Sequence, residues 1–318
     1  MSENKHTLLK IGILTAASCA CIKAINNSIS ACAVSKNILY KNSEEFYHWK
    51  HGDIHYTIRG IGSPILLIHD LNPGLNTNEW KYVVKSLAEN HTVYAIDLLG
   101  CGCSDRPHIT YTNYLYVQLI TSFIKDVIKS KTDVIASGLS ASLAVMACKN
   151  DSTIINNLVM VNPVDLAKLN EIPDQKSKIW KFLLEAPLFG TRFYHILTSR
   201  SNIELNFTEK YLYNPFHMDE QLVDSIYESA HIDESDGRYL LSSIKGKYVN
   251  FNICHALKTL NNNISIIYGS GEPHCRENIS LYQSINSSLK CEIISHTKHF
   301  PHVENPRLFL ESVKNLVQ

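Results

Sequence analysis

Residues 134–144, VIASGLSASLA, decide the fold. An apolar run with the length of a buried strand leads into Gly138, and a helix rich in small residues is predicted to follow from Ala141. A tight strand-to-helix turn at the edge of a parallel sheet admits only small side chains on either side of the residue that it presents. The pattern therefore predicts Ser140 as a nucleophile, with Ser142 where a glycine is more usual; the alternative is a tight turn with a structural serine.

Seven further runs have the length and pattern of strands, and helical patterns separate most of them. These runs span residues 45–49, 54–59, 64–69, 91–97, 154–161, 264–268 and 291–295, and the eighth is 133–137. Helices are predicted at 77–89, 114–129, 141–149, 277–285 and about 304–317. Strands that alternate with helices favour βαβ units, so we expect an α/β protein with a mostly parallel sheet of eight strands.

Residues 164–246 interrupt this alternation, because they look helical throughout and are rich in aromatic residues. Such an insertion between two halves of one sheet predicts a helical cap. The α/β core then comprises residues 41–163 and 247–318, and residues 1–40 form a separate N-terminal segment. The aromatic residues of the cap favour a pocket for a small apolar substrate, unless they only build the cap's own core.

A carboxylate follows the strand at 264–268 directly. Glu272 lies in the sequence Gly269-Ser-Gly-Glu-Pro273, at the carboxyl end of a predicted parallel strand. Open α/β sheets bind ligands at that edge, so Glu272 is predicted to orient a catalytic histidine. Asp165, which follows the strand at 154–161, is the alternative acid.

Three histidines lie between the last strand and the last helix. His299 is the predicted general base, because its position before the closing helix suits reach to the same edge, and His302 and His296 are the other candidates. Their spacing brings no companion carboxylates or thiols, so no metal site is predicted. Serine, acid and histidine thus follow one another in the order Ser140, Glu272, His299.

Backbone N–H groups are predicted to hold the negative oxygen that develops during acyl transfer. The N–H of Ala141, at the start of the helix, is one candidate, and the N–H of Leu71, in the loop after the strand at 64–69, is the other. His69 is interpreted as a structural residue that fixes this loop.

Together these stretches resemble the α/β-hydrolase superfamily, in the group with a helical cap. The resemblance covers roughly residues 45–318 and adds two further pieces, DLLGCGCSDRP at 97–107 and HFPHVENP at 299–306. It implies an α/β-hydrolase sheet and a serine hydrolase that cleaves a carboxyl-ester-type bond through an acyl-enzyme, with no cofactor.

Three residues depart from that pattern. Asp70 stands in place of the usual glycine after the histidine of the oxyanion loop, Ser142 replaces the elbow glycine, and Glu272 replaces the more frequent aspartate. The departures at Asp70 and Ser142 leave open one alternative from another class, a non-catalytic binding protein with the same fold.

Charge and cysteine content limit the remaining function classes. Lys+Arg and Asp+Glu are both 30, so no overall field attracts nucleic acid, and no nucleic-acid partner is expected. The nine cysteines fit no zinc pattern and favour reduced thiols in a reducing compartment.

The N-terminal segment contains an uncharged apolar run at residues 11–22, between Lys10 and Lys23. If these lysines extend toward the lipid headgroups, the apolar reach is 8–25, which spans a bilayer at the lower limit. We therefore predict a membrane anchor, with the rest of the chain otherwise cytoplasmic. A cleaved signal peptide and an amphipathic helix packed on the protein's own surface are the alternatives.

Overall fold

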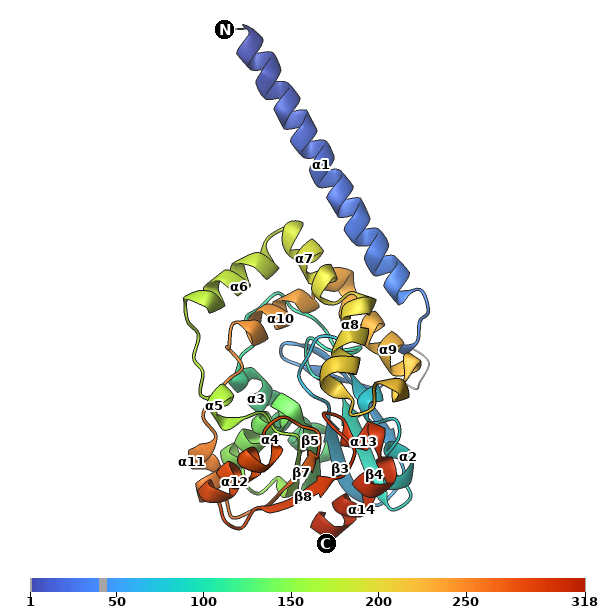
Figure 1. The fold of residues 1–318 in the computed structure, drawn as a ribbon, viewed down its shortest axis with the longest axis vertical. Coiled ribbons are helices and arrows are strands. Elements are labelled where there is room, and N and C mark those ends of the chain that lie inside the picture. Colours follow the sequence, from blue (N-terminus) through green and yellow to red (C-terminus); the bar gives the residue numbers. More distant parts are fainter. Residues whose placement is uncertain (1, 40–44, 318) are drawn as a thin grey trace.

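The computed structural model describes residues 2–39 and 45–317. Eight strands form one sheet in the order β1-β2-β4-β3-β5-β6-β7-β8 (Figure 1). The strands are β1 (Glu45–Trp49), β2 (Gly52–Arg59), β3 (Ser63–Ile68), β4 (His91–Ile96), β5 (Thr132–Ser137), β6 (Ile155–Val161), β7 (Asn263–Gly269) and β8 (Lys290–Ile294). β2 pairs antiparallel with both β1 and β4, and β3 to β8 run parallel to one another. The predicted mostly parallel eight-stranded α/β-hydrolase sheet is confirmed.

Alternate side chains of each central strand enter two separate cores. Leu66 and Ile68 of β3 pack with one set of helices, whereas Ile65 and Leu67 pack with the other. The first set is α3 (Asn113–Phe123), α4 (Gly138–Asn150), α11 (Cys254–Thr259) and α12 (Cys275–Ile285). The second set is the 3-10 turn η2 (Thr77–Trp80), α2 (Val84–Leu87) and α14 (Pro306–Val317). Both faces of the sheet are therefore covered, which is why its central strands are apolar at nearly every position.

A group of helices lies between β6 and β7 in the sequence. It comprises α5 (Leu166–Leu169), α6 (Gln175–Glu185), α7 (Phe189–Leu197), α8 (Arg200–Asn206), η4 (Phe207–Tyr211), η5 (Pro215–His217), α9 (Glu220–His231), η6 (Asp233–Ser235) and α10 (Gly237–Lys245). Most of these helices stack beyond one end of the sheet (Figure 1). They have their own small cores, one around Phe207 and Val223 and another around Leu184 and Tyr194.

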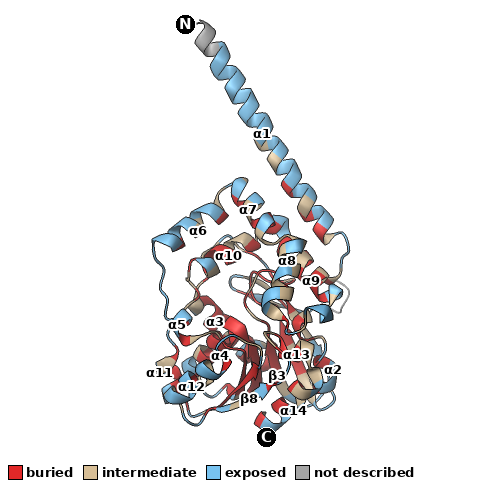
Figure 2. Ribbon diagram, viewed as in Figure 1, coloured by how far each residue is buried: buried red, intermediate tan, exposed pale blue. Residues whose placement is uncertain are grey.

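The N-terminal helix α1 (Ser2–Val34) projects away from the rest of the molecule (Figure 2). The part from His6 to Val34 has a mean hydropathy of 1.8 over an 18-residue window, which is long and apolar enough for a membrane span. Its last turns rest on the cap: Asn26 donates to the carbonyl of Leu188, and the hydroxyl of Ser30 lies 3.0 Å from that of Ser235. The expected boundary between residues 40 and 41 lies outside the described residues.

Several helices differ from their predicted bounds, and two of the differences concern the helices at 77–89 and after β5. The predicted helix 77–89 is broken into η2 and α2, since turn hydrogen bonds separate them at Trp80–Val83. The helix after β5 begins at Gly138 rather than at Ala141. This second difference moves the strand-to-helix turn, and it changes which residue the turn presents.

Candidate active site

The turn between β5 and α4 presents Gly138. Gly138 has a φ of +53°, in the left-handed region that glycine adopts without strain, and it directly follows the last strand residue, Ser137. A β-carbon at this position would overlap the carboxylate of Asp70. Ala136 and Ser140 are the small residues two positions before and after the turn. Gly138 therefore occupies the place at which the elbow pattern puts a nucleophile.

Ser140, the predicted nucleophile, lies inside the first turn of α4. It is fully buried, and its Oγ has no hydrogen-bond partner among the described residues. Ser142 is buried too and donates to the carbonyl of Leu139 at 2.6 Å. None of the described hydrogen bonds joins Ser140 to His299. The sequence contains two overlapping patterns of small residues, one centred on Gly138 and one centred on Ser140. The end of β5 at Ser137 puts Gly138, and not Ser140, at the turn.

His299 and Glu272, the predicted base and acid, lie in contact. Nδ1 of His299 lies 2.9 Å from Oε1 of Glu272. Backbone contacts fix the histidine, because its N–H donates to the carbonyl of Tyr211 at 3.0 Å and its own carbonyl accepts from the Asn162 amide at 2.8 Å. The ring of Tyr211, from the cap, lies 5.1 Å from the imidazole between centroids. The sheet and the cap thus both position His299.

Asp70 fills the centre of the site. Its Oδ1 accepts hydrogen bonds from the N–H of Leu71 at 2.8 Å and the N–H of Leu139 at 2.7 Å, and its Oδ2 lies 3.3 Å from Nε2 of His299. Leu71 is one of the two predicted oxyanion donors. The N–H group that points to the same oxygen from the start of α4 belongs to Leu139, two residues before the predicted Ala141. The unusual residue at position 70 was visible in the sequence, but its contacts with these N–H groups and with His299 were not.

The charges of the site reinforce one another. Burial alone would lower the pKa of His299, but hydrogen bonds to Asp70 and Glu272 and the charges of both carboxylates raise it to about 10. Burial likewise opposes ionisation of Asp70, but the hydrogen bonds from His299, Leu139 and Leu71 outweigh it and keep the pKa of Asp70 below its ordinary value. At neutral pH the site therefore contains an imidazolium between two carboxylates.

The other candidate residues have local partners. Asp165 accepts from the N–H of Ala167 at 2.7 Å and caps α5, and no described hydrogen bond joins it to His299. His302 is buried against Trp80, with ring centroids 4.3 Å apart, whereas His296 is exposed. His69 accepts from the N–H of Leu98 through Nε2 and contacts the carbonyl of Asp70 through Nδ1, so it fixes the oxyanion loop.

Two cavities meet at Tyr211. One, of about 290 Å³, is lined by the oxyanion loop from Asn72 to Leu75 and by cap residues that include Phe207. The other, of about 480 Å³, is lined by residues that include Glu272 and His299. Tyr211 lines both cavities.

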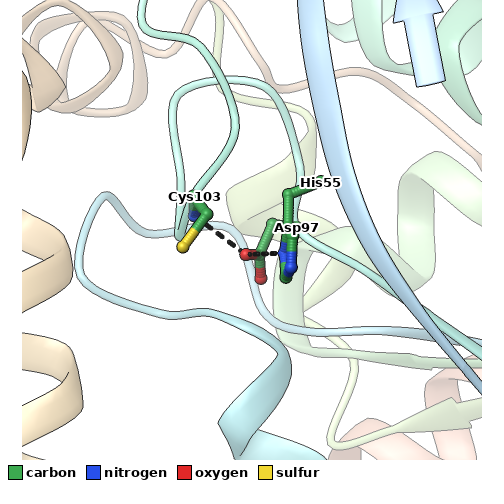
Figure 3. Close-up of side chains that lie close together, drawn as sticks. All are labelled: His55, Asp97 and Cys103. Carbon is green, nitrogen blue, oxygen red and sulfur yellow. Dashed lines mark hydrogen bonds and ion pairs between the residues drawn. The ribbon is translucent and has the colours of Figure 1, made fainter. Parts of the chain in front are cut away.

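A second polar cluster joins His55, Asp97 and Cys103 (Figure 3). Oδ2 of Asp97 lies 2.7 Å from Nδ1 of His55 and accepts from the N–H of Cys103 at 2.9 Å, while Oδ1 accepts from the N–H of Thr77. Within residues 2–39 and 45–317 this is the one group of three side chains close enough to share a metal ion. Because N–H groups already occupy both carboxylate oxygens, the cluster fits a structural pair that fastens the loop after β4.

Comparison with known proteins places the chain in a family. Residues 65–312 match the alpha/beta hydrolase family. The chain belongs to this family. Its curated relatives include 2-hydroxy-6-oxo-6-(2'-aminophenyl)hexa-2,4-dienoic acid hydrolase of Metapseudomonas resinovorans, which is 27% identical over 113 residues. That match covers 35% of this chain and 39% of the relative, so the chain matches about two fifths of the relative's length.

Solved structures of family members share the fold. The epoxide hydrolase CorEH has a TM-score of 0.70 at 17% identity and covers 86% of this chain and 98% of its own. A membrane phospholipase A described as a bacterial virulence factor has a TM-score of 0.68 at 16% identity and covers 98% of both chains. Family membership makes the chain an α/β-hydrolase, and these neighbours share its fold.

Proposed function

We propose that this chain hydrolyses a small-molecule substrate and that His299 and Glu272 handle the proton of the reaction. The observation that carries this proposal is the 2.9 Å contact between Nδ1 of His299 and Oε1 of Glu272 at the edge of the sheet, beside the larger cavity. A carboxylate in this position holds the imidazole in one orientation and stabilises its cation.

The attacking group predicted from the sequence is Ser140, and the bond predicted to be cleaved is a carboxyl ester. That reaction requires the hydroxyl of Ser140 to reach Nε2 of His299, and the described contact of Nε2 is with Asp70. A serine mechanism also requires a neutral imidazole, whereas the paired carboxylates favour the cation. Labelling by a fluorophosphonate that disappears in Ser140→Ala would support the sequence-based mechanism.

Hydrolysis is tested with the full-length protein in detergent and a panel of p-nitrophenyl esters and epoxides. His299→Gln should lower turnover of the reacting compound by about 10²–10⁴-fold, the usual contribution of a positioned acid or base. His296→Asn is the matched control: this histidine is exposed on the same loop, and asparagine tolerates its φ of +57°. Equal turnover by His299→Gln and wild type would contradict the proposal.

A non-catalytic binding protein is the second candidate. The observation that favours it is that the carboxylate of Asp70 accepts from both backbone N–H groups at the oxyanion position. Under this alternative the carboxylate of Asp70 permanently occupies the oxyanion position. The panel then yields no turnover, and Asp70→Gly changes stability alone.

The helix α1 supports a further proposal, that the chain is held at a membrane. Its exposed side chains include Leu8, Leu9, Ile11, Ile13 and Leu14, which water solvates poorly. Lys10 and Lys23 flank the central run and can extend to the headgroups. Recovery of the full chain in the membrane fraction, and release after deletion of residues 2–25, would support an anchor. Wild-type protein found wholly in the soluble fraction would refute it.

A further inference from the structure

A hollow in the surface of the cap lies at the turn between α6 and α7. It has a volume of about 590 Å³, and its lining includes Lys178, Lys181 and Phe182 of α6 and Phe189 of α7. We propose that this hollow binds an acidic phospholipid of the membrane that holds α1. The inference rests on the proposed membrane attachment and adds a ligand site, because none of the lining residues belongs to the two cavities at Tyr211.

The contact between α1 and the cap sets the level of the hollow relative to a membrane. The side chain of Asn26 donates to the carbonyl of Leu188, in the turn between α6 and α7, at 3.1 Å. Asn26 directly follows residues 8–25, the part of α1 that is proposed to lie in the bilayer. The turn is therefore level with the end of the apolar stretch, where the polar head groups begin. Both helices also lie at the end of the molecule from which α1 projects (Figure 1).

Aromatic side chains line one part of the hollow. Phe182 and Phe189 are largely exposed, although each is a large apolar residue. The helix ends at Glu185 and a new one begins at Phe189, so the two rings come from different helices and still line the same hollow. Exposed apolar side chains that gather in one place mark an interaction surface. At the level of the head groups, such rings can contact the upper part of the acyl chains.

Lys178 brings a positive charge that no carboxylate balances. None of the ion pairs and side-chain hydrogen bonds of the described residues involves its ammonium group. Lys181, by contrast, pairs with Glu185 at 2.8 Å and donates to the hydroxyl of Thr110 at 2.7 Å. Glu185 is the one carboxylate that lines the hollow, and it is already paired. The lining therefore has an excess of one positive charge.

The charged groups around the hollow leave this excess in place. Asp174, at the start of α6, accepts from the N–H of Ser177 and pairs with Lys247 at 3.1 Å. Arg192 follows Phe189 by three residues, is exposed, and takes part in no ion pair of the described residues. An anion that approaches the turn between α6 and α7 thus meets Lys178 and Arg192 and no unpaired carboxylate of the lining.

A phospholipid with a net negative head group satisfies both parts of the hollow. Its phosphate can pair with the ammonium group of Lys178, while its acyl chains lie beside Phe182 and Phe189. Free phosphate would use the charge and leave the rings in water. A zwitterionic phospholipid brings a cation of its own next to Lys178, so the acidic lipid should bind more tightly.

Retention of lipids by the full-length protein in mild detergent tests the inference. Phosphatidylglycerol and phosphatidylcholine with the same acyl chains are added in equal amounts, and native mass spectrometry counts the bound molecules. We expect wild type to retain one phosphatidylglycerol in preference to phosphatidylcholine. Lys178→Gln should lower this retention by about fivefold, the effect of one cation at a lipid surface, and Lys178→Arg should preserve it. Phe182→Ser should lower the retention of both lipids.

A matched variant and a competing ion sharpen the test. Lys290→Gln removes an exposed lysine from β8, far from α1, and should leave lipid retention unchanged. Inorganic phosphate at the concentration of the lipid should not displace it, because the rings contribute to binding. Equal retention of the two lipids by wild type, equal effects of Lys178→Gln and Lys290→Gln, or displacement by inorganic phosphate would each overturn the lipid site.

The results also separate the lipid site from the membrane attachment on which it rests. Protein that sediments with membranes but shows no preference between the two lipids would overturn the site and leave the attachment standing. Protein that stays wholly in the soluble fraction and retains no phospholipid would overturn both. Soluble protein that retains phosphatidylglycerol through Lys178 would refute the anchor and support the site.

Discussion

Asp70 and Gly138 share one space at the elbow between β5 and α4. A β-carbon on Gly138 would overlap the carboxylate of Asp70, and the left-handed φ of Gly138 makes any side chain there unfavourable as well. The carboxylate of Asp70 therefore fits only because position 138 has no side chain, although 68 positions separate the two residues in the sequence.

Two substitutions together, at positions 70 and 138, should convert the site into one with a serine nucleophile. In Asp70→Gly/Gly138→Ser, the hydroxyl would take the space of the carboxylate beside His299, and Leu71 and Leu139 would be free to bind an oxyanion. We expect this variant to react with a fluorophosphonate, and wild type not to react. Gly138→Ser alone should destabilise the fold by about 1–3 kcal/mol, because strain and overlap with Asp70 remain. A folded double variant without labelling would contradict this assignment of the elbow.

Replacement of the Glu272 carboxylate by an amide should slow turnover. In Glu272→Gln the imidazole keeps a hydrogen-bond partner but loses the charge that stabilises its cation. Turnover should fall by at least about 10²-fold, because the imidazolium that forms during the reaction loses its stabilising charge. Asp165→Asn is the matched control, because Asp165 follows a neighbouring strand and instead caps α5. A larger loss in Asp165→Asn than in Glu272→Gln would reverse the assignment of the acid.

The raised pKa of His299 predicts how stability depends on pH. Folding favours the protonated form, so the stabilising contribution is fully present below the ordinary pKa of 6.5 and is lost as pH rises toward about 10. Relative to His299→Gln, wild type should therefore lose stability between these two pH values. Urea unfolding at a series of pH values measures the difference. A constant difference over this range would show that the pKa of His299 is not raised by folding.

The buried cluster around Asp97 should contribute to stability and not to turnover. Asp97→Ala removes the acceptor for His55, Cys103 and Thr77 at once, and loss of one partner of a buried pair costs about 3–5 kcal/mol. Urea unfolding should show this loss. Asp53→Ala is the control and should change stability little, because Asp53 lies on the same strand as His55 but pairs with the exposed His48 of β1. Equal effects of the two substitutions would refute the structural role.

The cap should touch the bilayer if α1 is an anchor. Asn26 binds the carbonyl of Leu188 between α6 and α7, just after the apolar run, and the nearby Phe182 and Phe189 are 74% and 65% exposed. Phe189→Trp in full-length protein reconstituted into vesicles of brominated phosphatidylcholine should therefore be quenched. Ile293→Trp, on the exposed strand β8 at the far end of the molecule (Figure 1), should not be. Equal quenching of both would exclude this orientation.

Most of the fold could be predicted from the sequence because its strands are buried on both faces. Runs such as 64–69 and 133–137 are apolar at nearly every position, which limits them to a sheet covered by helices. Glu272 and His299 could be placed because each lies a few residues after such a run. The same information did not fix the start of α4, since helix ends are set by local backbone geometry that hydrophobic periodicity does not encode.

The role of Asp70 could not be found in this way. Its partners Leu139 and His299 lie 69 and 229 residues away, and no local pattern records that a carboxylate will meet two particular N–H groups. One available signal was the negative charge of Asp70, at a position that the resemblance assigns to glycine. A second signal was the glycine at position 138, and the two acquire meaning only together.

The attachment of α1 to the cap also sets the direction from which small molecules arrive. Asn26 and Ser30 fasten the helix to the same group of helices that lines part of both cavities. If α1 is held in a bilayer as proposed, a compound dissolved in the lipid would meet the helices that line the cavities before it meets the opposite end of the molecule. Partitioning into lipid would thereby raise the local supply of poorly water-soluble compounds without any change in the reacting groups themselves.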